Sequence, residues 1–316
     1  MKAMKTKIGV LALVAIVLIA IFMLIDAGGN WDYVLPRRFK KILAIILTGS
    51  VIAISTVIFQ TITNNRILTP SIIGLDSLYM FIQTFVIFFL GSASKTAMDK
   101  NLNFVLSVGL MILFAALLYK VLFRREGRNI YFLLLIGLIF GTLFNSLASF
   151  LQVLIDPNEF MILQDRMFAS FNNVNTDLLV ISCVLVIAII LYLRPFLKYL
   201  DVLSLGRDDA INLGVDYDYV VKRLLIVIAI LVSIATALVG PITFLGLLVA
   251  NVAYQFMKTY KHSYLLFGAS LISIIALVGG LLIVERVFTF STTISVIVNF
   301  IGGVYFIYLL LKENKA

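Results

Sequence analysis

The sequence predicts an all-α polytopic membrane protein, a single domain over residues 1–316 with ten transmembrane helices and one short two-helix elbow. Two observations on composition predict this class. Hydrophobic residues make up 62% of the 316 residues and charged residues only 13%, and the mean hydropathy is +1.11, far outside the usual composition of soluble domains. The third observation is that the apolar residues form long runs of bilayer-spanning length, bounded by charged or turn residues.

Ten such runs follow one another along the chain. We expect helices at residues 8–25, 42–60, 72–92, 103–123, 130–154, 176–193, 223–239, 242–257, 264–284 and 293–311. The first run follows three lysines, as in a signal peptide, but no small-residue cleavage site follows it, so a permanent helix is expected. Merging the seventh and eighth runs would leave nine spans. The Gly240–Pro241 pair favours two helices, because proline cannot continue a helical hydrogen-bond ladder.

Ten spans place both termini on one side of the membrane. The segments on that side contain seventeen of the 25 Lys and Arg residues, and the opposite segments contain eight. Because cytoplasmic loops are rich in Lys and Arg, the termini are expected in the cytoplasm. The net charge is +9, and the basic residues that carry it border apolar spans without forming a basic face. The expected partner is therefore membrane lipid and not nucleic acid.

The longest polar interruption, residues 200–219, holds five Asp and one Arg. Gly206 and Gly214 each follow a leucine, where glycine commonly ends a helix in the left-handed conformation. We therefore expect two short helices joined at Gly206, with Asp208 and Asp209 in the first turn of the second, where carboxylates suit the helix dipole. This elbow is expected on the cytoplasmic side, either as a docking surface for another protein or as an ordinary surface loop.

No catalytic, metal-binding or cofactor-binding pattern is present. The sequence has no phosphate-binding loop, dinucleotide fingerprint or zinc-protease motif. Its single cysteine, Cys183, lies within a span, and its single histidine, His262, is expected to be a solvated loop residue. Asp76 and Glu285 lie near predicted span ends, where a charge can reach the interface. Energy for uphill transport would therefore have to come from a partner.

Mid-span polar residues are expected to form interhelical hydrogen bonds. These residues are Gln60, Asn145, Asn251 and Asn299. Two other classes stay open beside a partner-driven transporter. An ion-coupled secondary transporter of a small polar solute would need buried ionisable groups and an inverted repeat, and a membrane enzyme would need a catalytic constellation near one interface.

Four stretches resemble a known family from about residue 34 to the end of the chain. The stretches are Ser204-Leu205-Gly206-x-x-x-Ala210-x-x-Leu213-Gly214-Val215, Gly240-Pro241-Ile242-x-Phe244-x-Gly246-Leu247, Leu35-Pro36-Arg37 followed by Gln60, Asn65, Pro70 and Gly74, and Ile301-Gly302-Gly303 before Phe306. They are similar, in order and spacing, to the permease subunits of the iron-siderophore and cobalamin class of bacterial ABC importers.

The chain departs from the family pattern at three places. Ala250-Asn251 stands where the family commonly has Pro-His, Arg66 replaces a proline, and the usual E-L-P-x-G before the last span is Ser291-Thr292-Thr293-Ile294-Ser295. This last variant resembles the subset associated with catecholate-type ferric siderophores, which are often imported through two different permeases that pair.

The resemblance implies a transport subunit in the bacterial plasma membrane with no ATPase site of its own. ATP and magnesium would be bound by two cytoplasmic ATPase subunits. A second permease subunit, identical or homologous, and an extracytoplasmic substrate-binding lipoprotein or periplasmic protein would complete the importer, whose cargo would be a ferric siderophore.

The resemblance also implies roles for particular residues. ATPase coupling falls to Leu203, Leu205, Gly206, Arg207, Asp208, Asp209, Ala210, Leu213, Gly214 and Val215, with Ile211 as a further apolar contact. Arg37, helped by Arg286, is expected to dock the binding protein, whereas Arg38, Lys40 and Lys41 are expected to reach lipid headgroups. The pathway and its hinges are expected at the helix breaks, namely Asn65, Pro70, Gly74, Gly240, Pro241 and Gly246.

Overall fold

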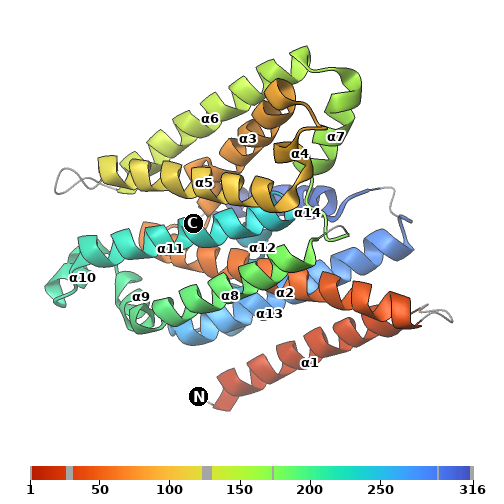
Figure 1. Cartoon of the computed structure of the whole chain (residues 1–316). Helices are drawn as coiled ribbons and strands as arrows, with labels where there is room; N and C mark the ends of the chain where they lie inside the picture. The colour runs from red at the N-terminus through yellow and green to blue at the C-terminus, as the bar shows by residue number, and fades with distance from the viewer. Residues whose placement is uncertain (1, 26–30, 123–129, 173, 290–291, 314–316) are drawn as a thin grey trace.

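The computed structural model describes residues 2–25, 31–122, 130–172, 174–289 and 292–313, and its regular elements within these ranges are all helices (Figure 1). Some residues used above lie outside the described residues. These are Ser291 and four of the seventeen basic residues counted on the side of the termini, namely Arg124, Arg125, Arg128 and Lys315.

A helix lies at each of the ten predicted ranges. The ten are α1 (Lys2–Leu24), α2 (Trp31–Thr63), α3 (Leu75–Leu90), α5 (Lys100–Leu122), α6 (Ile130–Leu154), α8 (Thr176–Leu193), α11 (Tyr217–Val239), α12 (Leu245–Met257), α13 (His262–Arg286) and α14 (Ile294–Glu313). The described connections contain the short elements η1 (Pro70–Ile73), α4 (Lys95–Met98), α7 (Pro157–Met167), η2 (Arg194–Phe196), α9 (Leu197–Leu203) and α10 (Arg207–Asn212).

Seven of the described helices are long and apolar enough to cross a bilayer, namely α1, α2, α5, α6, α8 with its continuation into α9, α11 and α13. Three more, α3, α12 and the described part of α14, are apolar but shorter. The structure is therefore that of a polytopic all-helical membrane protein. Two of the shorter helices, α3 and α12, begin at chain breaks, after η1 and after residues 240–244.

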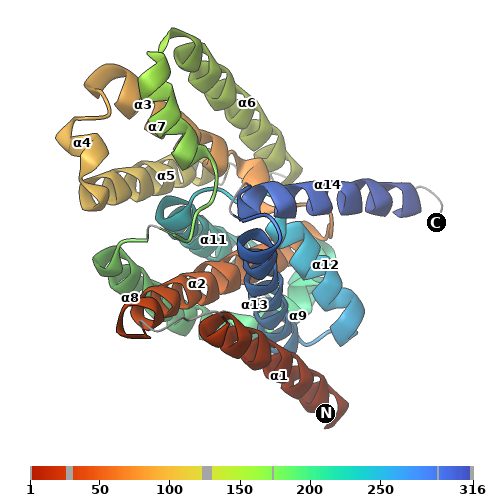
Figure 2. The same cartoon turned by 90° about the vertical axis from the view of Figure 1, so that its right-hand side faces the viewer.

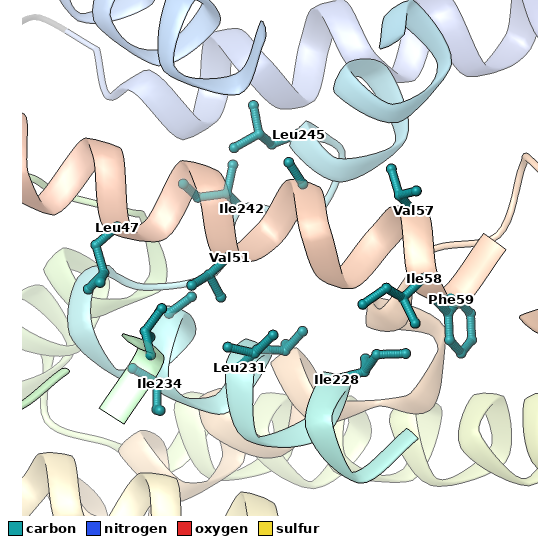
Figure 3. Close-up of a cluster of buried hydrophobic side chains, with 14 of the residues drawn as sticks. Leu47, Val51, Val57, Ile58, Phe59, Ile228, Leu231, Ile234, Ile242 and Leu245 are labelled. Carbon is teal, nitrogen blue, oxygen red and sulfur yellow. The ribbon is translucent and has the colours of Figure 1, made fainter. Parts of the chain in front are cut away.

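The central helix of the bundle is α2, which packs against α11, α12 and α13. In Figure 3, Val51 and Ile58 of α2 point toward Leu231 and Ile228 of α11, and Leu245 of α12 lies on the other side of α2. All five side chains are buried. Because α2 is covered on several sides, it links the surrounding helices to one another.

The break between α11 and α12 falls at the predicted Gly240–Pro241 pair. Gly240 has φ +97°, a left-handed value that favours glycine. A Cβ on Gly240 would lie 3.1 Å from the Ala169 Cα, and the Ser170 N–H donates to the Val239 carbonyl at 2.8 Å. The break is therefore fixed by the segment that follows α7, and the prediction of two separate helices here is confirmed.

Four of the short helices lie at the ends of the bundle. In Figure 1, α9 and α10 lie at one end, and α4 and α7 lie at the other. Figure 2 shows α14 extending sideways from the bundle, where it contacts α12 and α13.

Candidate functional site

The elbow consists of the two short helices that the sequence predicts. Helix α9 ends at Leu203, α10 begins at Arg207, and Asp208 and Asp209 occupy the first turn of α10. Gly206 and Gly214 have φ values of +112° and +82°, positive values that favour glycine, but the ψ of 167° at Gly206 is extended and not the left-handed helical conformation expected there. No neighbouring atom lies within 4 Å of a Cβ placed on either glycine. The two glycines are thus required by backbone conformation and not by packing.

The apolar residues of the elbow divide into a buried set and an exposed set. Leu203 and Ala210 are buried and hold the elbow against the bundle, so they are not available for contact with a partner. Leu203, which the family resemblance assigns to ATPase coupling, thus packs inside the chain itself. Leu205, Ile211 and Leu213 are exposed, with 59%, 43% and 63% of their surface accessible.

The polar rim of the elbow is solvated. Arg207 lies 3.9 Å from Asp208, with side-chain exposures of 48% and 93%, and stacks over the Tyr217 ring at 5.5 Å. Asp209 is exposed, and Val215 is half-buried. An ion pair with this exposure contributes little stability, which leaves its charges accessible to a partner.

Two of the predicted hinge regions meet at one small cavity. Pro70, which begins η1, and Gly246, in the first turn of α12, both line a cavity of about 20 Å³. A Cβ on Gly246 would overlap the Thr56 hydroxyl of α2. The close approach of α12 to α2 therefore requires glycine at this position.

The remaining predicted hinge residues surround these two. The Asn65 carboxamide oxygen accepts the Ile67 N–H at 2.9 Å and shapes the turn after α2. Gly74 has φ +86°, and a Cβ there would lie 3.0 Å from the Gly137 carbonyl oxygen and from the Gly141 Cα of α6. Pro241 is half-buried at the start of the second break.

Asp76 lines the same cavity and is half-buried. Thr236 of α11 donates to its carboxylate at 3.1 Å, and the Ser71 side chain forms a further hydrogen bond to it. The Asp76 carboxylate is thus held between η1 and α11, in the first turn of α3.

A polar stripe on α6 is a feature that the sequence reasoning missed. Thr142, Asn145, Ser146 and Ser149 are spaced i, i+3, i+4 and i+7, so they share one face of the helix, and all four are exposed in the single chain. Asn145 also donates to the Ser77 hydroxyl of α3 at 3.0 Å. The Thr142 hydroxyl donates to the Leu138 carbonyl of its own helix at 2.8 Å, so the Asn145 carboxamide is the group of the stripe that most favours contact with protein or water. The spacing alone could have revealed the stripe.

The other mid-span polar residues form the interhelical or loop contacts expected of them. Gln60 and Asn251 both donate to the Arg66 carbonyl, at 2.7 and 2.9 Å, and Asn299 accepts the Phe244 N–H at 3.4 Å. Arg66 and Asn251 are two of the positions that depart from the family pattern. Their contact shows that these departures lie at one place in the structure.

A basic hollow of about 900 Å³ lies at the end of the bundle opposite the elbow. Its charged lining consists of Arg37, Arg38, Lys40, Lys41, Lys100, Glu285 and Arg286. Arg37 is exposed, and its guanidinium stacks over the Tyr33 ring at 4.1 Å. This arrangement holds the charge of Arg37 at the rim of the hollow.

Several cations of the hollow bind the protein itself. Arg38 donates to the carbonyls of Phe22, Met23 and Ile25 at 2.7–3.0 Å, which caps the C-terminal end of α1. Lys41 forms a 2.9 Å ion pair with the nearly buried Glu285. The expectation that Arg38 and Lys41 extend to lipid is therefore wrong, and Glu285 pairs within the protein.

Arg286 has a structural contact in addition to its place in the hollow. It donates to the Ile25 carbonyl at 3.2 Å. Lys40 is exposed at the rim, as a headgroup contact would require.

His262, expected in solvent, is in fact 3% exposed at the first residue of α13. Its neighbours in the sequence are polar, and tertiary packing alone buries it.

Comparisons with known proteins agree on one family. The FecCD transport family matches residues 8–312. The chain is 66% identical over 312 residues to the petrobactin import system permease protein YclO of Bacillus subtilis, covering 99% of both chains. It is 38% identical over 283 residues to the petrobactin import system permease protein FatC of Bacillus anthracis, covering 89% of this chain and 79% of the relative.

The fold is also similar to that of a solved structure. An inward-facing metal-chelate type ABC transporter superposes with a TM-score of 0.85 at 24% identity, covering 98% of this chain and 99% of the other. This likeness concerns the fold, whereas the match over residues 8–312 concerns the sequence itself. The chain belongs to the FecCD transport family.

Proposed function

We propose that this chain is a membrane-spanning permease subunit of an ABC importer that translocates a ferric siderophore. The observation that carries the transport role is the α6 stripe of Thr142, Asn145, Ser146 and Ser149, a row of small neutral polar side chains exposed on a helix of membrane-spanning length. A bulky chelate in transit is suited by such a surface, which offers hydrogen bonds without tight ligation. Family membership supports the same role.

The cargo is proposed from the relatives. Both petrobactin import permeases named above are similar over most of this chain, so ferric petrobactin is the siderophore to test first. The chain itself is proposed to bind neither metal nor cofactor, and to have no ATPase site. ATP and magnesium would be bound by two cytoplasmic ATPase subunits that press on the elbow.

In the proposed topology, ten helices cross the plasma membrane and both termini are cytoplasmic. The shorter helices α3 and α12 are completed by the segments at their breaks, which are tolerated at membrane depth only inside protein or along a cavity. Asn65, Pro70, Gly74, Gly240, Pro241 and Gly246 would then act as hinges of the pathway. A second permease subunit, identical or homologous, would complete that pathway.

The basic hollow is proposed to face an extracytoplasmic binding protein. Arg37 is its best placed contact, since its guanidinium is exposed and stacked. Arg286 would help through its charge, although it also donates to the Ile25 carbonyl. Complementary charge at such a rim mainly steers association.

The pathway proposal is tested by cysteine accessibility in the assembled complex. With Cys183→Ser as background, Ser146→Cys is expected to react with a membrane-impermeant thiosulfonate in at least one nucleotide state. Leu147→Cys, an exposed apolar position 39% accessible that lies about 100° around α6 from Ser146, is the matched control and should react far more slowly, because lipid excludes the reagent. Equal, slow labelling of both positions in the nucleotide-free and the ATP-trapped states would contradict a water-filled route along α6.

The docking proposal predicts a charge-dependent affinity. Arg37→Glu is expected to weaken binding of the binding protein to the reconstituted complex about tenfold, chiefly through slower association that depends on salt. Lys95→Glu is the matched control, since Lys95 is an exposed cation on α4 outside the hollow. Surface plasmon resonance at two salt concentrations measures both. Equal effects of the two substitutions would show that net charge, and not the hollow, sets the affinity.

A further inference from the structure

The chain's only histidine joins the elbow to two membrane helices. The Asp201 Oδ1 atom of α9 accepts the His262 backbone N–H at 2.7 Å and lies 2.8 Å from His262 Nδ1. On the other side of the ring, His262 Nε2 lies 2.9 Å from the Thr61 hydroxyl of α2. The side chains of Asp201, His262 and Thr61 therefore form one continuous link from α9 through α13 to α2.

The hydrogen bonds of this link are consistent with one another. In the tautomer with a proton on Nδ1, the ring donates to Asp201 and Nε2 accepts the Thr61 hydroxyl proton, which otherwise goes to the Val57 carbonyl at 2.8 Å. His262 and Thr61 are only 3% and 4% exposed. A buried polar group that loses its partner costs free energy, so the three residues are held together.

The link continues to the turn that follows α2. The Tyr254 side chain of α12 interacts with Thr61, and the Arg66 guanidinium stacks over the Tyr254 ring at 4.7 Å. The Arg66 carbonyl is in turn bound by Gln60 and Asn251. A polar network thus runs from the elbow to the end of α2 from which the chain enters η1 and the predicted hinges.

We infer that Asp201, His262 and Thr61 form a coupling strut that transmits movement of the elbow to this end of α2. These three side chains are positioning residues for transport, a role that rests on the proposed function. A displacement of α9 pulls on the start of α13 and on α2 at the same point, because one carboxylate oxygen and one imidazole ring join all three helices. Apolar contacts could slide, whereas these hydrogen bonds fix the register.

The strut is tested in the reconstituted complex by comparing ATP hydrolysis with uptake of radiolabelled ferric petrobactin. His262→Phe keeps a ring of similar size and removes both nitrogens. We expect the complex to assemble and to hydrolyse ATP at a near-normal basal rate, but to move at least about fivefold fewer siderophores per ATP. Fivefold is the lower end of the usual coupling between two linked sites. Ser263→Ala, at the exposed neighbouring position, is the matched control and should behave as wild type.

Variants of the partner residues separate coupling from simple loss of structure. Asp201→Asn keeps an oxygen that accepts both His262 donors, so it should retain coupling, whereas Asp201→Ala should lose it. The double variant Asp201→Ala, His262→Phe should be no worse than the poorer single variant, because either change breaks the same link. Normal uptake per ATP in His262→Phe, or additive losses in the double variant, would overturn the inference.

A measurement on the chain without its ATPases distinguishes failure of the strut from failure of the proposed function. Spin labels on Asp209→Cys of α10 and Gln255→Cys near the end of α12, with Cys183→Ser, report the distance between the elbow and α12 in lipid nanodiscs. His262→Phe is expected to broaden the distance distribution, and Ser263→Ala to leave it unchanged. An unchanged distribution in His262→Phe overturns the strut even if the wild-type complex transports. A broadened distribution without any ATP-driven uptake by wild type overturns the proposed function alone.

Discussion

Replacing Gly246 by valine is expected to destabilise the chain and to stop transport. A Cβ at this position overlaps the Thr56 hydroxyl of α2, and valine adds two further methyl groups to the same space. Thr56 is 1% exposed and cannot move into solvent. Overpacking of this kind costs about 1–3 kcal/mol. We expect a corresponding decrease in the unfolding free energy and no siderophore uptake, because α12 would be forced away from α2.

Two comparisons make this prediction specific. Gly109→Val is the matched control, since a Cβ on Gly109 of α5 meets no atom within 4 Å. Thr56→Ala removes the hydroxyl and one methyl group, so the pair Gly246→Ala, Thr56→Ala should recover part of the stability that Gly246→Ala loses. Thermal unfolding of the purified chain measures all of these variants. A Gly246→Val protein as stable as Gly109→Val would show that α12 does not approach α2 closely.

Much of the fold follows from local chemistry and could be predicted. Apolar runs placed a helix at each of the ten ranges, Gly240–Pro241 ended α11, and Gly206 and Gly214 bounded α10 with positive φ values that favour glycine. These features depend on runs of apolar residues and on backbone conformations open to glycine. Both can be recognised in short stretches of sequence.

The errors concern tertiary contact. Asp76 stands at the start of α3, as expected of a residue near a span end, but its hydrogen bonds to Thr236 of α11 and Ser71 of η1 have no local signal in the sequence. His262 has polar neighbours in the sequence, and only the packing of α9, α13 and α2 buries it. Arg38 appeared free because the carbonyls that it caps belong to α1. Contacts between elements distant in sequence leave no local pattern.

The most direct test of the account is vanadate-sensitive ATPase activity of the reconstituted complex, with wild type compared to the variant Gly206→Val, Gly214→Val. Valine is strained at the positive φ values of both glycines, at a cost of about 1–3 kcal/mol each. Because neither position contacts other residues closely, the strain acts on the elbow and spares the bundle. The account predicts that the variant assembles and hydrolyses ATP at a basal rate, but that the binding protein no longer stimulates hydrolysis. An assembled variant with normal stimulation would contradict coupling through the elbow. A wild-type chain that associates with no ATPase would contradict the importer itself and favour an ion-coupled transporter, in which Asp76 would be the first residue to examine.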